Sequence, residues 1–434
     1  MPETHSTAAN TPGEDTMRGP TQPEVAAPGG VEVCDLSALA AAEGCDLAAD
    51  PSPVYARLTG AGPVHRVRIP GVEGACWLIT GHEQACAALL DTRFSNDIRH
   101  SAAWTDDGGH AVGRNMLQSD APQHTRLRRL VAGEFTARRV EGMRPRVQRL
   151  TDALVDALAH QPQVDLVEAL ALPLPLAVIC ELMGVPETDR AAFHRWSSET
   201  VDPGSPEAGA AAAAAMSGYF TELFALKRAG GDDDLLGALV RASDRAASAA
   251  EGRLTEEELL GMAFLLLVAG HETTVNLLSG GVLALLQHPE QFEALRADWS
   301  LLDGAVEEML RWTAPVQTSA FRFTTTSVTV GGTEIPAGEP VLIGLAAASR
   351  AEELLPRAAE FDIHRPISQS RAHVAFGHGA HHCLGAPLAR MEARTAIRTL
   401  LQRCPGLRLA EQPPSWRSHM LLRGPRTLPV LTGA

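Results

Sequence analysis

The longest apolar pattern in the chain runs from Thr255 to about His288. Its core, LLGMAFLLLVAGHETTVNLLSGGVLALL, is hydrophobic on nearly every side of a helix, which is typical of a helix buried in a protein core. Thr255 is followed three residues later by Glu258, the spacing of a capping box at a helix start. His271 and Glu272 interrupt the apolar run before it is long enough to span a bilayer. We therefore predict a long central helix and no membrane span.

Helical periodicity also dominates the chain from about residue 95 to residue 312. Residues 36–95 instead contain short apolar stretches separated by Gly and Pro, which predict small strands and a hairpin between short helices. A second hairpin is expected after residue 320, with its turn at 331–332. A final helix is expected from about Gly385 to Arg403. The sum is a mainly α fold with a minor β region.

Composition limits the class of protein and its partners. We expect residues 1–30, rich in Pro, Thr, Gly and Glu, to form a disordered tail, and residues 31–434 to form one large domain because no long linker interrupts them. The formal net charge of −15 argues against nucleic acid or an anionic membrane as a partner. Seven scattered cysteines without a CxxC pair favour a reducing compartment, and residues 1–30 contain no signal peptide pattern. We therefore expect a cytoplasmic protein.

The segment with the most chemical information is FGHGAHHCLG, residues 376–385. Cys383 comes just before the predicted final helix, where free backbone N–H groups and the helix dipole favour a metal-binding thiolate. Gly377 and Gly385 allow the backbone to approach a bulky flat ligand closely. One alternative is a buried structural cysteine. Another is a zinc site with His378, His381 and His382, although ligands so crowded lack the usual spacing.

Inside the central helix, AGHETT at residues 269–274 places polar groups where they cost stability. The hydroxyl of Thr273 can bond the carbonyl of Ala269 four residues earlier, and with Gly270 beside it the helix could open a groove for water or dioxygen. The alternative is a polar patch that neighbouring residues satisfy.

Three further groups of charged residues could serve a site or lie in solvent. Glu308 and Arg311 are three residues apart on one helix face with apolar flanks. His124 and Arg128 are four apart on another helix, and Arg322 lies in a predicted strand. Cationic groups at fixed positions suit carboxylate binding, but arginine is more often simply exposed.

These segments, in this order, resemble the cytochrome P450 superfamily, and the resemblance covers residues 31–434. It implies a single P450-type domain with the long central helix over haem b, held by the thiolate of Cys383 as the iron ligand. His381 matches a position that contacts a haem propionate. The other implied haem contacts are His124, Arg128, Arg322, Ala269, Gly270, Phe376, Gly377 and Gly385.

The same resemblance implies a monooxygenase. Thr273 and Glu272 match the pair that manages protons during dioxygen activation. No flavin or iron–sulfur module is recognisable, so electrons are expected from a ferredoxin and its NAD(P)H-dependent reductase. We expect a monomer with a docking face formed by arginines of two helices. These are Arg126, Arg128, Arg129, Arg390, Arg394 and Arg398.

Glu308 and Arg311 match a structural motif of the family that is often completed by a second arginine. At that position this chain has Glu360. Arg357 or Arg365 could substitute, and the sequence does not decide between them.

The substrate is expected to be a hydrophobic or amphipathic small molecule, by resemblance a macrolide or another polyketide-type metabolite that is hydroxylated or epoxidised. Alternatives are ring closure or oxidative coupling by the same cofactor, a haem sensor or carrier, and a non-catalytic helper protein of the same fold. The predicted pocket residues are Met116, Leu117, Phe264, Val316, Thr318 and Leu421.

Overall fold

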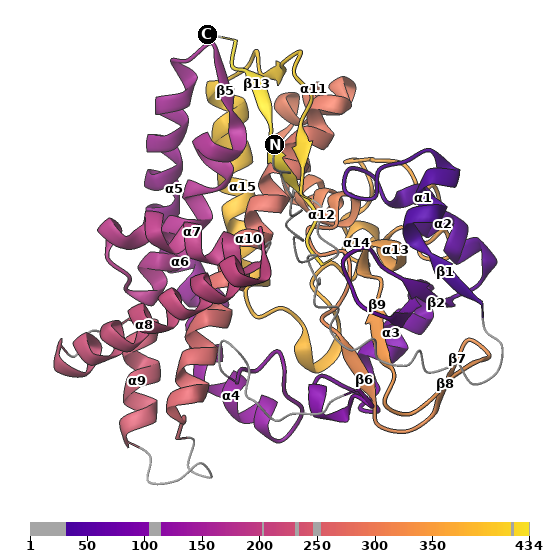
Figure 1. Cartoon of the computed structure of the whole chain (residues 1–434). Helices are drawn as coiled ribbons and strands as arrows, with labels where there is room; N and C mark the ends of the chain where they lie inside the picture. Colours follow the sequence, from indigo (N-terminus) through magenta and orange to yellow (C-terminus); the bar gives the residue numbers. More distant parts are fainter. Residues whose placement is uncertain are drawn as a thin grey trace, which may run out of the picture. The chain divides into compact units, whose positions relative to one another are not determined.

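The computed structural model describes residues 32–103, 114–201, 204–230, 234–245, 253–417 and 421–433. The chain from Val33 onward forms one compact unit, mostly helical with small sheets (Figure 1). The predicted tail at residues 1–30 lies outside the described residues.

Helix α10 (Glu256–Gln287) is the central element of the helical region. Thr255 caps it as predicted: its hydroxyl accepts the N–H of Glu258, and the Glu258 carboxylate accepts the N–H of Thr255. The helix is long and apolar enough to cross a membrane, but 67% of its most apolar window is buried inside the protein. It packs against α6 (Pro173–Met183), α12 (Leu302–Thr313) and α15 (Ala386–Arg403). The prediction of a buried core helix is confirmed.

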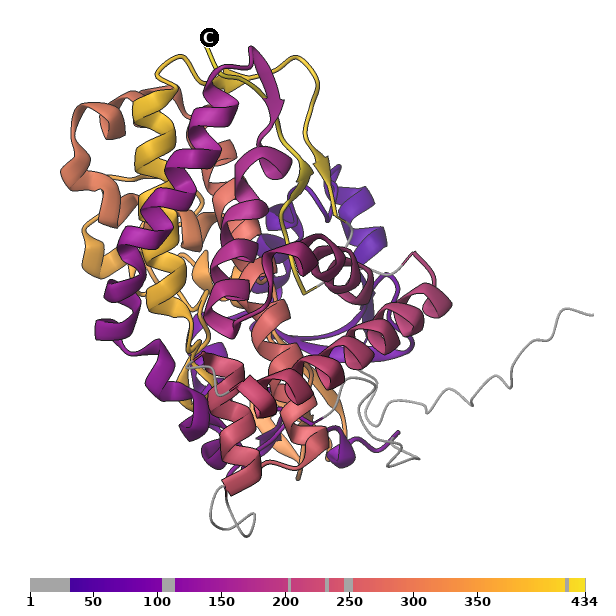
Figure 2. The same ribbon diagram turned by 90° about the vertical axis from the view of Figure 1, so that its left-hand side faces the viewer.

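The remaining helices surround α10 or cover the sheet. Helix α5 lies along α15 (Figure 2), and α7 packs on α8. The alanine-rich helix α8 starts at Pro206, because proline suits a first helical turn, where its missing N–H costs nothing. The bounds are α1 Leu36–Glu43, α2 Ser52–Ala61, α3 His82–Leu90, α4 Gln123–Ala132, α5 Ala137–Ala159, α7 Arg190–Val201, α8 Pro206–Gly230, α9 Leu235–Arg245, α11 Pro289–Ala297, α13 Leu345–Ser349 and α14 Ile367–Ser370.

The main sheet has six strands in the order β1-β2-β3-β9-β6-β4. β2 and β3 form the predicted antiparallel hairpin, with Val64 opposite Ile79. β3 pairs in parallel with β9, which brings the N-terminal hairpin beside the strands that follow residue 320. The bounds are β1 Val33–Asp35, β2 Val64–Arg68, β3 Ala75–Ile79, β4 Phe94–Ser95, β6 Arg322–Thr324 and β9 Pro340–Ile343.

Smaller pairings complete the β structure. β7 and β8 form the second predicted hairpin, and its turn uses Gly331 and Gly332, both with positive φ. β13 pairs with β5 and β10, and β11 with β12. The bounds are β5 Gln163–Asp165, β7 Val328–Val330, β8 Thr333–Ile335, β10 Arg408–Leu409, β11 Ser415–Trp416, β12 Pro425–Thr427 and β13 Pro429–Leu431.

Candidate functional site

The cysteine loop, residues 376–385, lies between two of the three hydrophobic cores of the described residues. Val374 packs in the core beside the sheet, and Phe376 packs against the helical core. The N–H of Cys383 donates to the carbonyl of Phe376 at 2.8 Å, which closes the loop. Gly377 and Gly379 have φ of 69° and 75°, a region that favours glycine. The cysteine is therefore presented two residues before the N-cap of α15.

The electrostatics of Cys383 combine opposing effects. Its side chain is exposed on one side, yet the protein packed on its other sides raises the pKa of the thiol by desolvation. The N–H groups of Gly385 and Ala386 act in the opposite direction, as do the guanidinium groups of Arg128 and Arg390. The predicted help from the helix start is present, but by itself it does not lower the pKa of the thiol. A metal ion bonded to sulfur deprotonates a thiol outright.

Four cationic or imidazole side chains converge near the loop. The rings of His124 and His381 lie 4.1 Å apart, and Arg128 donates to the carbonyl of His382 at 2.6 Å. Burial lowers the pKa of Arg322 to about 10. Burial, then the charges of His124, Arg322 and Arg128, lowers the pKa of His381 to about 3. The carboxylate of Asp120 opposes these shifts at Arg322 and His124, but the four side chains still outnumber it.

The hydroxyl of Thr273 donates to the carbonyl of Ala269 at 3.0 Å, as the sequence predicted. Helix α10 is continuous through Gly270, and the expected groove for water or dioxygen stays a prediction. A Cβ on Gly270 would lie 2.6 Å from two atoms of Ile179 on α6. This glycine allows close packing of two helices, and Thr273 makes its backbone hydrogen bond on an unbroken helix.

Glu272 is buried and held from three directions. Arg417 donates to Oε2 at 2.5 Å, and Ser198 donates to Oε1 at 3.3 Å. Burial alone would raise the pKa of Glu272, but His271 and Arg417 hold it well below its usual range. The Glu272 carboxylate is therefore ionised, and it forms an ion pair with Arg417, the residue that follows β11.

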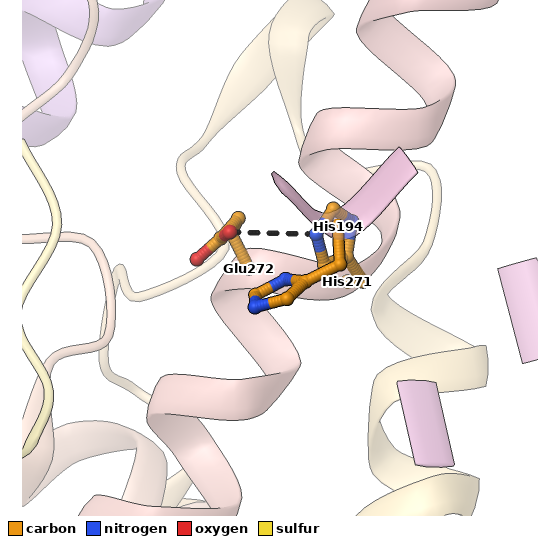
Figure 3. A group of neighbouring side chains, drawn as sticks. All are labelled: His194, His271 and Glu272. Carbon is orange, nitrogen blue, oxygen red and sulfur yellow. Dashed lines mark ion pairs between the residues drawn. The ribbon is translucent and has the colours of Figure 1, made fainter. Parts of the chain in front are cut away.

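His194, His271 and Glu272 point toward one another from α7 and α10 (Figure 3). Their donor atoms lie within 4.8 Å, and the imidazole of His271 is 3.4 Å from Glu272. Both nitrogens of His271 already have partners, the Leu267 carbonyl at 2.8 Å and the Ser197 hydroxyl at 2.9 Å. The group therefore forms a hydrogen-bonded contact between the two helices. It is the one such donor group among the described residues, so nothing there supports the zinc alternative at Cys383.

Glu308 and Arg311 are fully buried and bonded by two contacts of 2.7 and 2.8 Å. Arg365 adds a bond of 3.3 Å to Oε1 of Glu308. Arg357 is 63% exposed and pairs instead with Glu360 and Asp362. The structure thus selects Arg365 as the second arginine of this motif.

The predicted pocket residues do not all lie together. Val316 bridges to Leu422, and the N–H of Gln317 donates to the Leu421 carbonyl, so Val316, Thr318 and Leu421 lie on adjacent extended segments. Phe264 and Met116 both pack in the helical core. Leu117 is 39% exposed. Much of the loop before Met116 lies outside the described residues.

Residues far away in the sequence hold these groups in place, and the sequence did not predict them. Arg417 is 145 positions from Glu272, so no local pattern could connect them. Glu307 is bonded by Arg390 and His373, and its position beside Glu308 was the available signal.

The residues at this site fit haem b. Two buried nitrogens, Nε2 of His124 and Nε of Arg322, have no partner among the described residues, and buried polar atoms normally have one. Carboxylates such as haem propionates would satisfy them and balance the clustered positive charge. A cysteine thiolate is a soft ligand that suits iron, and Cys383 lies in the loop that Arg128 contacts.

Comparisons with known proteins agree with this geometry. The family model "Cytochrome P450" matches residues 225–429. The chain is 52% identical to the cytochrome P450 monooxygenase PikC of Streptomyces venezuelae over 419 residues, covering 95% of this chain and 97% of that relative. It is 42% identical to the mycinamicin IV hydroxylase/epoxidase of Micromonospora griseorubida, covering 87% and 94%. The structure of the tirandamycin C-bound P450 monooxygenase TamI superposes with a TM-score of 0.82 at 45% identity, covering 89% and 98%.

Members of this family bind haem b through a cysteine thiolate. Identity of this level across nearly the whole length extends well beyond the cysteine loop, to the sheet and the helices on both sides of α10. The chain therefore belongs to the cytochrome P450 family and is a haem-thiolate monooxygenase.

Proposed function

We propose that this protein is a soluble cytoplasmic monooxygenase that hydroxylates or epoxidises a macrolide- or polyketide-type metabolite. The observation that carries the proposal is the similarity over nearly the full chain to relatives named for such compounds, including mycinamicin IV. Residues 31–434 would form the catalytic domain, acting as a monomer. Ring closure or coupling on the same cofactor is the alternative reaction.

Cys383 would be the iron ligand, with His124, Arg128, Arg322 and His381 holding the haem propionates. The convergence of these four side chains, and the unpartnered nitrogens among them, support this assignment. When bound, haem b supplies the reductive activation of dioxygen. The remaining haem contacts would come from Ala269, Gly270, Phe376, Gly377 and Gly385.

Thr273 and Glu272 would serve the proton supply. The Thr273 hydroxyl is fixed by the Ala269 carbonyl, so its oxygen can accept a further hydrogen bond from water. The hydroxyl of Ser198 on α7 donates a hydrogen bond to the ionised carboxylate of Glu272 on α10. A proton would pass between the two helices along this hydrogen bond. Arg417 keeps the carboxylate in place.

The absorption spectrum of the dithionite-reduced protein under carbon monoxide tests the ligand assignment. We expect the long-wavelength Soret band of thiolate ligation, and its loss in Cys383→Ser. Cys45→Ser, at a cysteine of the N-terminal region, is the matched control and should keep the band. An unchanged band in Cys383→Ser would overturn the assignment.

The substrate class is tested separately, by the spin-state shift of the ferric protein with a panel of macrolides and other polyketides. Turnover with a ferredoxin, its reductase and NAD(P)H should then give a product heavier by one oxygen atom. A product lighter by two hydrogens and without added oxygen would favour ring closure, and a product that joins two substrate molecules with the loss of two hydrogens would favour coupling.

For the electron donor we propose an acidic ferredoxin that docks on the arginine face of α4 and α15. Arg126 and Arg390 are engaged with Glu258 and Glu307, so they are poor candidates for direct contact. Arg129 is exposed, and Arg394 has only a 3.3 Å contact to a largely exposed Asp303. Arg394→Glu should slow reduction most at low salt. Equal rates for Arg394→Glu and the distant Arg408→Glu at every salt concentration would contradict this docking face.

A further inference from the structure

A cavity of about 270 Å³ lies between the C-terminal half of α10, the end of α12 and the C-terminal segment of the chain. None of its lining residues belongs to the site described above. Gly280, its first residue on α10, is about two helical turns beyond Thr273. A buried water molecule needs only about 15 Å³, so the cavity has room for a small organic molecule.

Two guanidinium groups line this cavity, and neutral groups hold both. Arg350 donates to the Ser52 hydroxyl and the Trp312 carbonyl, and its guanidinium lies 3.9 Å from the Trp312 ring centre. Arg423 donates to the carbonyls of Thr313 and Ala49. These acceptors fix the positions of the two cations without neutralising their charge.

The charge balance of the cavity is positive. Asp50 is the one carboxylate among the lining residues, and it is exposed, with one oxygen accepting the N–H of Ser52 at 3.1 Å. Burial lowers the pKa of Arg350 to about 9, and the charge of Arg423 acts in the same direction. Burial also lowers the pKa of Arg423. The carboxylate of Asp50 opposes both shifts, but the lining sets two guanidinium groups against this one carboxylate, so its net charge is positive.

Two lining residues also carry unsatisfied polar atoms. Nε of Arg423 and the hydroxyl of Thr313 are buried and have no partner among the described residues. The other walls are apolar or aromatic: Leu283 and Ala284 on α10, and the indoles of Trp312 and Trp416. The Arg423 guanidinium lies 5.1 Å from the Trp416 ring centre. The cavity therefore combines a cationic side with flat hydrophobic surfaces.

We propose that this cavity binds a small organic carboxylate, with its charged group beside Arg350 and Arg423 and its apolar body against Trp312, Trp416 and Leu283. The ligand would join α10, α12 and the segment around Gly424 into one unit. The N–H of Arg423 donates to the Pro315 carbonyl at 3.1 Å. The cavity therefore lies on the same chain segment as Leu421, and this segment runs beside the segment that contains Val316.

Benzoate is a suitable probe, with benzamide as its neutral isostere and inorganic phosphate as an anion without an apolar body. Titration calorimetry is carried out on the haem-loaded enzyme with imidazole bound to the iron, which keeps the probe away from the cofactor. We expect saturable binding of benzoate, and weaker or no binding of benzamide and phosphate. Equal affinities for benzoate and benzamide would show that the two arginines do not recognise the carboxylate. Equal affinities for benzoate and phosphate would show that the apolar walls do not contribute to binding.

Two exposed positions at the rim allow isosteric changes of charge with little effect on folding. Asp50→Asn keeps the oxygen that accepts the N–H of Ser52 and removes the competing charge, so benzoate should bind about fivefold tighter. Gln287→Glu adds a negative charge and should weaken binding by a similar factor. Ala284→Leu should block the cavity. Identical affinities in the wild type and all three variants would place the benzoate elsewhere and refute this site.

Discussion

Arg390 donates two hydrogen bonds to the carboxylate of Glu307, at 2.8 and 2.9 Å, and its guanidinium lies 4.5 Å from the ring centre of Phe376. One side chain thus connects α12 to the first residue of the cysteine loop. His373 and Arg371 approach the same carboxylate at 3.2 and 3.3 Å. Glu307 is therefore the centre of a buried ionic network directly behind the loop.

The network predicts a specific dependence of stability on pH. Burial alone would raise the pKa of Glu307, but the bonds from His373 and Arg390 lower it to about 2 from an ordinary value of 4.5. A depressed carboxyl pKa contributes stability that is complete above about pH 4.5 and is lost as the pH falls toward 2. At neutral pH, Glu307→Gln should lower the free energy of unfolding by roughly 3 kcal/mol.

Urea unfolding of the wild type and Glu307→Gln between pH 7 and pH 3 measures this difference. The difference in free energy of unfolding between the wild type and Glu307→Gln should become steadily smaller below pH 4.5. Glu290→Gln, at an exposed position on α11, should show no gap at any pH. A constant gap across the whole range would mean that ionisation of Glu307 is not what stabilises the loop.

The choice between Arg357 and Arg365 gives a second stability prediction. Arg365 is 4% exposed at its side chain and bonds Glu308 as well as the carbonyls of Pro356 and Glu360. Removing one partner of a buried charge is costly, so Arg365→Ala should lower the free energy of unfolding by roughly 3 kcal/mol. Arg357→Ala should change it by less than about 0.5 kcal/mol. Similar losses in both variants would contradict the assignment.

The sequence was sufficient for features that depend on local pattern. The capping box at Thr255, the turn at Gly331 and the bond between Thr273 and Ala269 all involve residues within four positions of one another. It could not choose Arg365, because that choice depends on the path of the chain between residues 356 and 365. It also could not reveal the packing contact of Gly270, whose neighbour Ile179 comes from a helix about 90 residues earlier. For both Arg365 and Gly270, contacts with residues far away in the sequence or along the chain path determine the structural role.

Thr273→Ala should leave haem content and substrate affinity unchanged and divert reducing equivalents to hydrogen peroxide, because it removes the hydroxyl that we propose orders water. Product formed and peroxide released per NAD(P)H consumed measure the partition. Thr273→Ser retains a hydroxyl that can bond Ala269 and should restore much of the coupling. Unaltered product yield in Thr273→Ala would show that this residue does not serve proton delivery.

Arg417→Gln tests the contact that holds Glu272. Without the guanidinium, burial should raise the pKa of Glu272 above its wild-type value, although His271, the larger of the two lowering influences, still holds it down. The carboxylate would then become protonated at a higher pH than in the wild type, so product yield per NAD(P)H should begin to fall at a higher pH as the medium is made acidic. Arg408→Gln, on β10, is the matched control. Parallel pH profiles for wild type and Arg417→Gln would remove Arg417 from the proton supply.

The packing of α6 on α10 gives the last prediction. A Cβ at Gly270 would lie 2.6 Å from Cγ1 and Cδ1 of Ile179 and 3.4 Å from its Cβ. Gly270→Ala should therefore destabilise the protein by about 1–3 kcal/mol, although alanine is the better helix former. Ile179→Ala removes the two clashing atoms and keeps the third, so the double variant should be more stable than the sum of the two single changes predicts. A double-mutant cycle from thermal or urea unfolding measures this coupling. Strict additivity would mean that the two helices can separate without cost, and that Gly270 is not required for their close approach.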